Sequence, residues 1–188
     1  MATLYLDSMP EAEAISGRSY RRDVATTLPS TPLSERLAGK PRETRPRRYG
    51  IFSATGEDAF WVILDSPPPL WFEPVLKRAV DLLNLPLEWD GYKASRISQR
   101  AVETTILLLL DCAPEDMAAP HMVPVNNGGV QLEWHEQGID LEIEVSPSGM
   151  IEAELVVEAE DLEEEWNGRR ESNKAPLQQW LRKLKRPR

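Results

Sequence analysis

Apolar and polar residues alternate with a period of two between residues 129 and 157, the clearest secondary-structure signal in the chain. Turn-forming residues divide this segment into runs at 130–135, 139–145 and 150–157. Short turns between such runs predict an antiparallel sheet with one dry and one wet side. The dry side collects Val130, Leu132, Trp134, Ile139, Leu141, Ile143, Val145, Ile151, Ala153, Leu155 and Val157. The wet side collects Gln131, Glu133, His135, Asp140, Glu142, Glu144, Glu152, Glu154 and Val156.

Two helices and one more strand are expected before this sheet. The apolar run Ala59–Leu64 ends at three prolines, which favours a buried strand. Residues 71–84 place apolar side chains at helical spacing, and Ser98 can cap a second helix that continues to about Asp111. The helices and the Trp61 strand would cover the dry side. We therefore predict an α+β fold, with a three- to four-stranded antiparallel meander packed on two helices.

Charge and proline content divide the chain into three parts. Residues 1–48 are rich in Pro and Arg and lack a lasting apolar period, which predicts a flexible arm. Residues 49–160 form the expected α+β domain. Residues 161–188 are expected to hold an acidic linker and a basic amphipathic C-terminal helix. Residues 111–168 contain sixteen acids and no Lys or Arg, whereas 169–188 contain eight Lys or Arg and one acid, an asymmetry that favours recognition of charged partners or of one segment by the other.

The wet side of the sheet carries six carboxylates, and three explanations stay open. It can be a solvated face that discourages aggregation, a docking surface for a basic partner, or a mimic of nucleic-acid phosphate. A metal site is not expected, because alternation spaces the acids about 6 to 7 Å apart along each strand. The expected partner-binding acids are Glu133, Glu142, Glu144, Glu152 and Glu154.

The C-terminal segment 176–188 places an apolar stripe opposite a basic side. The stripe can pack on its own domain, enter a groove of another protein or lie on an anionic membrane. Protein contact is favoured, because so few apolar residues bury too little for membrane attachment. The basic side can also approach the acidic segment, within the chain or in a homo-oligomer. The stripe residues expected to bind a partner are Leu177, Trp180, Leu181 and Leu184.

The most distinctive local sequence is Trp89-Asp90-Gly91-Tyr92, between the two helices. Asp-Gly suits a tight turn, and the two aromatic residues are expected to anchor it against the helices. The chain here resembles a recurring group of bacterial proteins without an assigned function. Residues 85–92, Ile97, Ala101, 128–135 and 141–144 carry the resemblance, within residues 72–157, although Lys93 stands where that group often has glycine. The resemblance implies a bacterial or phage origin and supplies no catalytic residues.

The sequence nominates no catalytic, metal-binding or cofactor-binding residue. The chain has two histidines and a single cysteine, Cys112, and it contains no phosphate loop, nucleophile elbow or metalloprotease motif. An enzyme would need a cleft near Asp90, His121 and His135. The start of the chain is a poor secretory signal and no apolar run could span a bilayer, so a cytoplasmic location without a membrane span is expected.

The first functional hypothesis is a non-enzymatic protein-interaction module, with an antitoxin, immunity or other neutralising or adaptor role. It would dock through the acidic sheet face and the amphipathic tail, and could form a homo-oligomer. The alternatives are a nucleic-acid-associated protein that uses residues 36–48 and 169–188 as basic arms, and an enzyme of unknown chemistry. Phosphate binding by the arms should weaken steeply with salt and with loss of Lys or Arg in the tails, whereas docking by the acidic face should fail when Glu142, Glu144 and Glu154 are made neutral.

Overall fold

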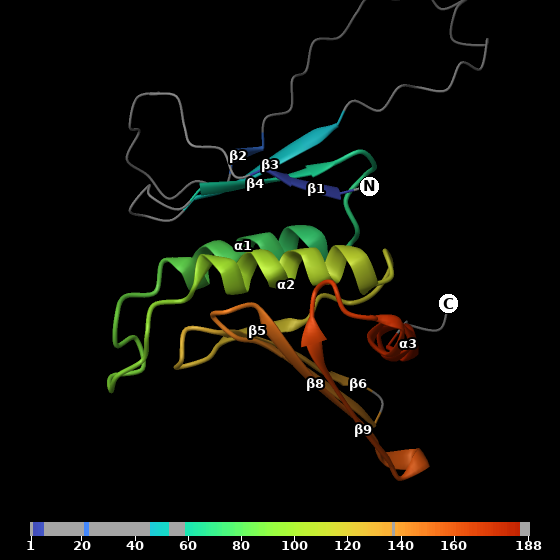
Figure 1. Cartoon of the computed structure of the whole chain (residues 1–188). Helices are drawn as coiled ribbons and strands as arrows, with labels where there is room; N and C mark the ends of the chain where they lie inside the picture. Colours follow the sequence, from blue (N-terminus) through green and yellow to red (C-terminus); the bar gives the residue numbers. More distant parts are fainter. Residues whose placement is uncertain (1, 6–20, 23–45, 53–58, 137, 185–188) are drawn as a thin grey trace, which may run out of the picture.

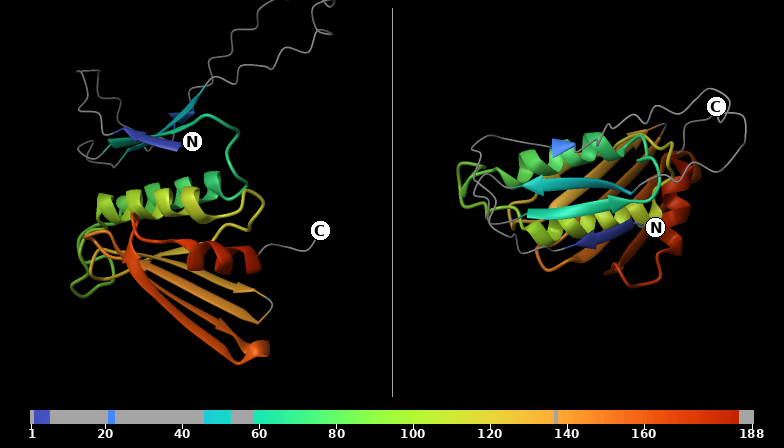
Figure 2. Two further views of the ribbon diagram at one scale, coloured as in Figure 1. Left: turned by 45° about the vertical axis from the view of Figure 1, so that its right-hand side comes forward. Right: turned by 90° about the horizontal axis from the view of Figure 1, so that it is seen from above.

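The chain folds into three layers, in which a pair of helices lies between two antiparallel sheets (Figure 1). The computed structural model describes residues 2–5, 21–22, 46–52, 59–136 and 138–184. Figure 2 shows the same layers from another side and from above, where the strands of the smaller sheet lie over the helices. The predicted α+β class is confirmed.

The larger sheet has five strands rather than the expected three or four. Its order β5-β6-β7-β8-β9 follows the sequence, and all neighbours are antiparallel. The sequence pattern did not predict β5 or β9. Strand β5 is short and contains proline, and β9 carries acids on both faces, so neither shows a clear alternation of apolar and polar residues. The strands are β5 His121–Pro124, β6 Val130–Glu136, β7 Ile139–Val145, β8 Met150–Val157 and β9 Leu162–Arg169.

The dry side of this sheet contacts the helical layer. Helices α1 (Phe72–Leu83) and α2 (Gln99–Cys112) form where the apolar periodicity places them. Leu132, Leu141 and Ile143 are fully buried. At the strongly apolar end of α2, Ile106, Leu108 and Leu109 are fully buried, because sheets cover the helix pair from both sides. Burial of apolar surface on both sides of the helices unites the layers in one core.

The sequence suggested that the Trp61 strand covers the dry side of the five-stranded sheet, and this prediction was wrong. The strand is β4 (Ala59–Leu64), and it belongs to a second sheet with the order β1-β4-β3-β2 on the opposite side of the helices. The other strands there are β1 Ala2–Tyr5, β2 Arg21–Arg22 and β3 Arg47–Phe52. Parts of the expected flexible arm therefore pair as strands, and residues 1, 6–20 and 23–45 lie outside the described residues.

The segment expected to be an acidic linker is structured. After a 3-10 turn, η2 (Glu158–Glu160), residues 162–169 form β9 and pair with β8 along its whole length. A second turn leads to α3 (Ala175–Lys183). Pairing with β8 satisfies the backbone of this segment despite its high charge, which the sequence pattern could not show.

Candidate functional site

The polar side of the five-stranded sheet gathers acids from four consecutive strands. Directly opposite residues of antiparallel strands share a face, so the strand register assigns each side chain to a side. The register adds two acids of β9 to the six that the sequence predicted. The acidic face consists of Glu133, Asp140, Glu142, Glu144, Glu152, Glu154, Glu163 and Glu165.

Four of these acids form a straight row across the sheet. Glu133 lies opposite Glu142, Glu142 opposite Glu154, and Glu154 opposite Glu165. We call these four residues the carboxylate row. Neighbouring strands are about 4.8 Å apart, and like charges directly opposite one another destabilise a sheet. Glu144 and Glu152 form a further opposed pair beside the row. The face therefore concentrates negative charge in an arrangement that is unfavourable for the isolated protein.

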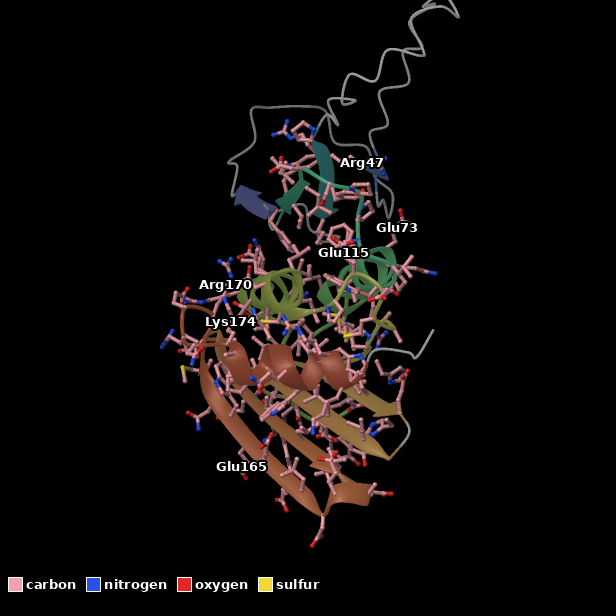
Figure 3. The ribbon with its side chains drawn as sticks, turned by 90° about the vertical axis from the view of Figure 1, so that its right-hand side faces the viewer. Arg47, Glu73, Glu115, Glu165, Arg170 and Lys174 are labelled. Atoms are coloured by element: carbon pink, nitrogen blue, oxygen red, sulfur yellow. The ribbon has the colours of Figure 1, made fainter. Side chains whose placement is uncertain are left out.

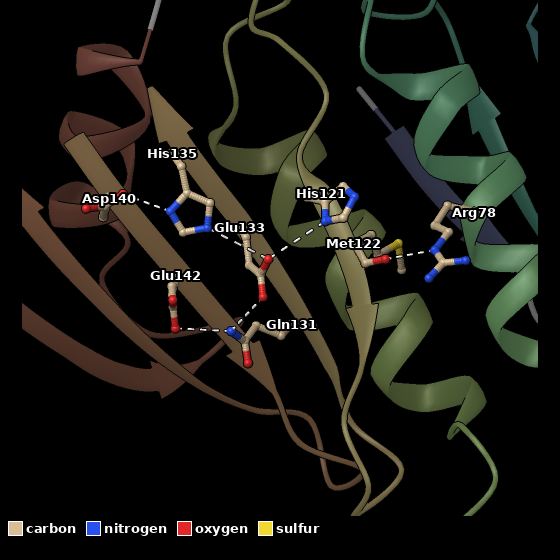
Figure 4. A network of polar contacts seen from close by, with 8 residues as sticks. All are labelled: Arg78, His121, Met122, Gln131, Glu133, His135, Asp140 and Glu142. Carbon is tan, nitrogen blue, oxygen red and sulfur yellow. Dashed lines mark hydrogen bonds and ion pairs between the residues drawn. The ribbon is translucent and has the colours of Figure 1, made fainter. Parts of the chain in front are cut away.

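Two histidines and a glutamine lie at the β5 and β6 end of the row (Figure 4). Gln131 Nε2 donates to Glu133 Oε1 and Glu142 Oε2, both at 3.1 Å. The imidazole Nδ1 of His121 and the Nε2 of His135 each lie 3.8 Å from Glu133 Oε2. These neighbours moderate the charge of Glu133 and Glu142, at one end of the row.

His135 has a raised pKa. Its Nδ1 lies 2.8 Å from Asp140 Oδ1. This hydrogen bond raises the pKa of His135 above its ordinary value of 6.5, and the nearby charges of Asp140, Glu133 and Glu142 act in the same direction. Protonation of His135 would add positive charge to the face as the pH falls, so binding by this face should depend on pH.

The face is concave between β6 and β9. A hollow of about 410 Å³ there has Glu142, Glu144, Glu152, Glu154 and Glu165 in its lining. The part of the chain that the structure describes holds no group of three or more His, Cys, Asp or Glu residues placed to bind a metal ion. Carboxylates spread over a concave surface suit the Lys or Arg side chains of a partner better than a single ion.

The apolar stripe of the C-terminal helix is not a docking surface. Leu177 and Leu181 are fully buried, and Trp180 and Leu184 are nearly so, in the core of the chain itself. Trp180 Nε1 also donates to Glu164 Oε2 on β9 at 2.6 Å. Of the three explanations that the sequence left open, the structure therefore shows self-packing. Helix α3 lies on the side of the helical layer that faces the five-stranded sheet (Figure 1).

Basic residues around α3 pair with acids of the same chain. Arg170 Nε and Lys174 Nζ donate to Asp111 Oδ2, at the end of α2, at 3.0 and 2.9 Å. Partial burial alone would raise the pKa of Asp111, but the hydrogen bonds from Lys174 and Arg170 outweigh it and lower the pKa. Lys183 Nζ lies 3.3 Å from Glu160. Figure 3 shows Arg170 and Lys174 beside the helices, with Glu165 farther away on the sheet.

The Trp89–Tyr92 turn forms, but Tyr92 does not anchor it. Asp90 Oδ1 accepts the backbone N–H groups of Tyr92 and Ala94 at 2.8 and 3.1 Å, and Trp89 Nε1 donates to the Ser95 carbonyl. Gly91 adopts a φ of +79°, as the sequence predicts for Asp-Gly. The Tyr92 side chain is 83% exposed, so the expectation that it packs on the helices was wrong. Backbone hydrogen bonds hold the turn without it.

The loop between α1 and α2 contacts the turn between β5 and β6 at this end of the molecule. Ser95 N donates to the Asn126 carbonyl, and Ser98 N donates to the Gly128 carbonyl. A Cβ atom on Gly128 would lie 2.7 Å from the Arg96 carbonyl oxygen. The Gly-Gly turn before β6 therefore packs directly on the segment after the Trp89 turn. Both segments therefore form one structural unit.

Residues that could have formed an enzyme cleft do not converge. His121 and His135 both approach Glu133, but the Asp90 carboxylate is engaged within its own turn. Burial raises the pKa of the Cys112 thiol to about 11, which keeps it protonated near neutral pH. Among the residues that the structure describes, the acidic face is the group of polar side chains that most clearly favours one kind of ligand, a positively charged one.

Comparison with known proteins places the chain in no family. No family model matches the sequence, and neither a curated protein nor a solved structure matches it. Among the described residues, no helix has the length and apolar character needed to cross a membrane. The fold and the acidic face therefore define an α+β protein with one strongly anionic sheet surface, and the function has to be argued from that surface.

Proposed function

We propose that the chain is a non-enzymatic protein-interaction module whose acidic face binds a basic surface of a protein partner. The carboxylate row carries this proposal. A face that only needs to be soluble can separate its charges or mix both signs, whereas here the acids are opposed in register and Gln131 and the two histidines moderate one end of the row only. Opposed acids in register cost folding free energy, and that cost is offset when Lys or Arg side chains of a partner enter the row.

A neutralising or adaptor role fits such a surface. Anionic faces that complement a basic target increase the association rate and exclude wrongly charged partners. The resemblance noted in the sequence is consistent with a bacterial or phage origin and carries no function, so the antitoxin, immunity or adaptor role rests on the acidic face alone. The nucleic-acid alternative has less support, because Arg170, Lys174 and Lys183 of the expected C-terminal arm are paired with acids of the same chain.

Neutralisation of the face tests the proposal. The full chain and a Glu142→Gln/Glu144→Gln/Glu154→Gln variant serve as baits in an extract of the native host. A matched control, Asp81→Asn/Glu115→Gln/Glu171→Gln, removes three exposed acids elsewhere. Binding of the captured protein is then measured by calorimetry at several salt concentrations.

We expect a partner that the wild type and the control retain and the face variant loses. Three interfacial charge pairs at about 0.2–1 kcal/mol each predict about a 3- to 150-fold weaker Kd for the face variant, with most of the difference removed by high salt. A partner that all three baits retain equally would show that this face does not bind it.

A further inference from the structure

The two edges of the five-stranded sheet differ in whether another strand can join them. At β5, the Met122 carbonyl accepts a hydrogen bond from Arg78 Nε at 2.8 Å (Figure 4). Pro124, two residues later, faces the same way and has no N–H to offer. Side-chain capping and proline are common means of protecting an edge strand. The β5 edge is therefore closed.

The β9 edge keeps its backbone groups available. Met150 directs both its N–H and its carbonyl toward Ser146, at the β7 side of the sheet. Backbone groups of successive residues point to opposite sides of a strand, so Ile151 faces β9, and its partner Gly168 faces β8. The residues of β9 that alternate with Gly168 therefore face outward. They are Glu163, Glu165 and Asn167.

No strand of the described chain pairs with that outer side. The sheet order ends at β9, and at its last residue the Arg169 backbone bonds to Ser172 at 3.0 and 2.9 Å. In Figure 3, β9 forms the border of the sheet, with Glu165 at its middle. An open edge of this length is a template for an added strand.

The side chains of the same residues decide which strand can be added. Glu163 and Glu165 belong to the acidic face, so residues placed opposite them on a new strand would continue the carboxylate row. A second copy of β9 would bring acids against acids and is disfavoured. Lys or Arg at every second position would meet Glu163 and Glu165 and present the remaining side chains to the other face.

We infer that β9 binds an extended segment of the protein partner that carries Lys or Arg at alternate positions and joins the five-stranded sheet as a sixth strand. This inference rests on the proposed function and specifies how the partner engages the acidic face. Backbone hydrogen bonds to Glu163, Glu165 and Asn167 supply affinity, and the carboxylates select the basic sequence.

A synthetic peptide, Thr-Lys-Val-Lys-Val-Lys-Thr with blocked ends, tests the inference on the full chain. The matched probe has the same sequence and charge but is N-methylated at alternate residues, which removes the backbone donors. Two such probes, methylated in either phase, allow for both alignments of the peptide. Binding is measured by calorimetry, and amide exchange in β9 is followed by NMR.

We expect one methylated probe to bind about tenfold or more weakly than the parent peptide, which corresponds to two lost hydrogen bonds. The parent should also slow exchange of the Glu163, Glu165 and Asn167 amides. Asn167→Pro, which removes an outward donor and no charge, should weaken the parent peptide similarly.

Other results overturn the inference and separate it from the proposed function. The parent and methylated peptides could bind equally well and leave β9 unprotected, while Glu142→Gln/Glu144→Gln/Glu154→Gln still abolishes binding. That result would reject strand addition and leave the acidic face as the binding surface. Binding that is insensitive to those three substitutions would reject both. Protection of β9 without peptide, together with a dimer in solution, would identify a second copy as the occupant.

Discussion

Replacement of Glu142 by Gln should make the isolated protein more stable. Glu142 is exposed in part and lies at the centre of the carboxylate row, opposite Glu133 on one side and Glu154 on the other. Each directly opposed like-charged pair costs about 0.2–1 kcal/mol, so removal of two should raise the free energy of unfolding by about 0.4–2 kcal/mol at low salt. Coulomb's law in water gives a similar figure of about 0.8 kcal/mol per pair at about 5 Å.

One hydrogen bond limits the gain but should not reverse it. Gln131 Nε2 donates to Glu142 Oε2, and the amide carbonyl that replaces this carboxylate in Glu142→Gln could accept the same bond without the charge. The loss is about 0.5 kcal/mol, because the contact is exposed. The net change should therefore lie between about zero and about 1.5 kcal/mol in favour of the folded state.

Urea unfolding at pH 7 measures this change at about 20 mM and about 0.5 M NaCl. The gain should shrink at the higher salt, where the screening length falls to about 4 Å. Glu115→Gln removes the same charge from an exposed loop and should change stability by less than about 0.5 kcal/mol. If Glu142→Gln destabilises the protein at low salt, or if its effect on the free energy of unfolding does not become less favourable as salt is added, the row stores no repulsion and the main support for a binding role is lost.

Three further predictions concern other parts of the structure. Asp111→Asn should lower the free energy of unfolding by about 0.5–1.5 kcal/mol at pH 7, because the partly exposed carboxylate loses Arg170 and Lys174. Since its pKa is lowered in the folded state, this stabilisation is lost as the pH falls through that pKa, and unfolding at pH 3 should show a smaller difference. Gly128→Ala should cost about 2–4 kcal/mol in thermal or urea unfolding, whereas Gly91→Ala, which has a similar positive φ but open space around it, should cost only about 1–2 kcal/mol; equal costs would mean that the contact with Arg96 is unimportant. The raised pKa of His135 contributes stability that is fully present below its unfolded value near 6.5 and is lost as the pH rises through the folded value. His135→Gln should therefore destabilise at pH 5.5 and not at pH 8, and an NMR titration with a pKa at or below 6.5 would contradict the contact with Asp140.

Local sequence determined the elements in which one physical signal dominates. The period-two pattern from Val130 to Val157 placed three strands and sorted their side chains correctly into buried and polar sets, because burial on one face leaves only one acceptable register. Helical spacing placed α1 and α2 for the same reason. The six acids of these strands could thus be assigned to one face from the alternation alone.

Tertiary structure decided what lies beside those elements. Nothing local distinguishes a stripe such as Leu177–Leu184 that packs inside the chain from one that binds outside it, since both require the same apolar spacing. The acids of β9 obscured its strand pattern, so Glu163 and Glu165 joined the face only through pairing with β8. The place of β4 on the far side of the helices, and the open edge of β9, depend on contacts between distant segments. The sequence therefore predicted the negative charge of the acidic face. It did not predict that the face continues onto β9 or that the outer edge of β9 is unpaired in the described chain.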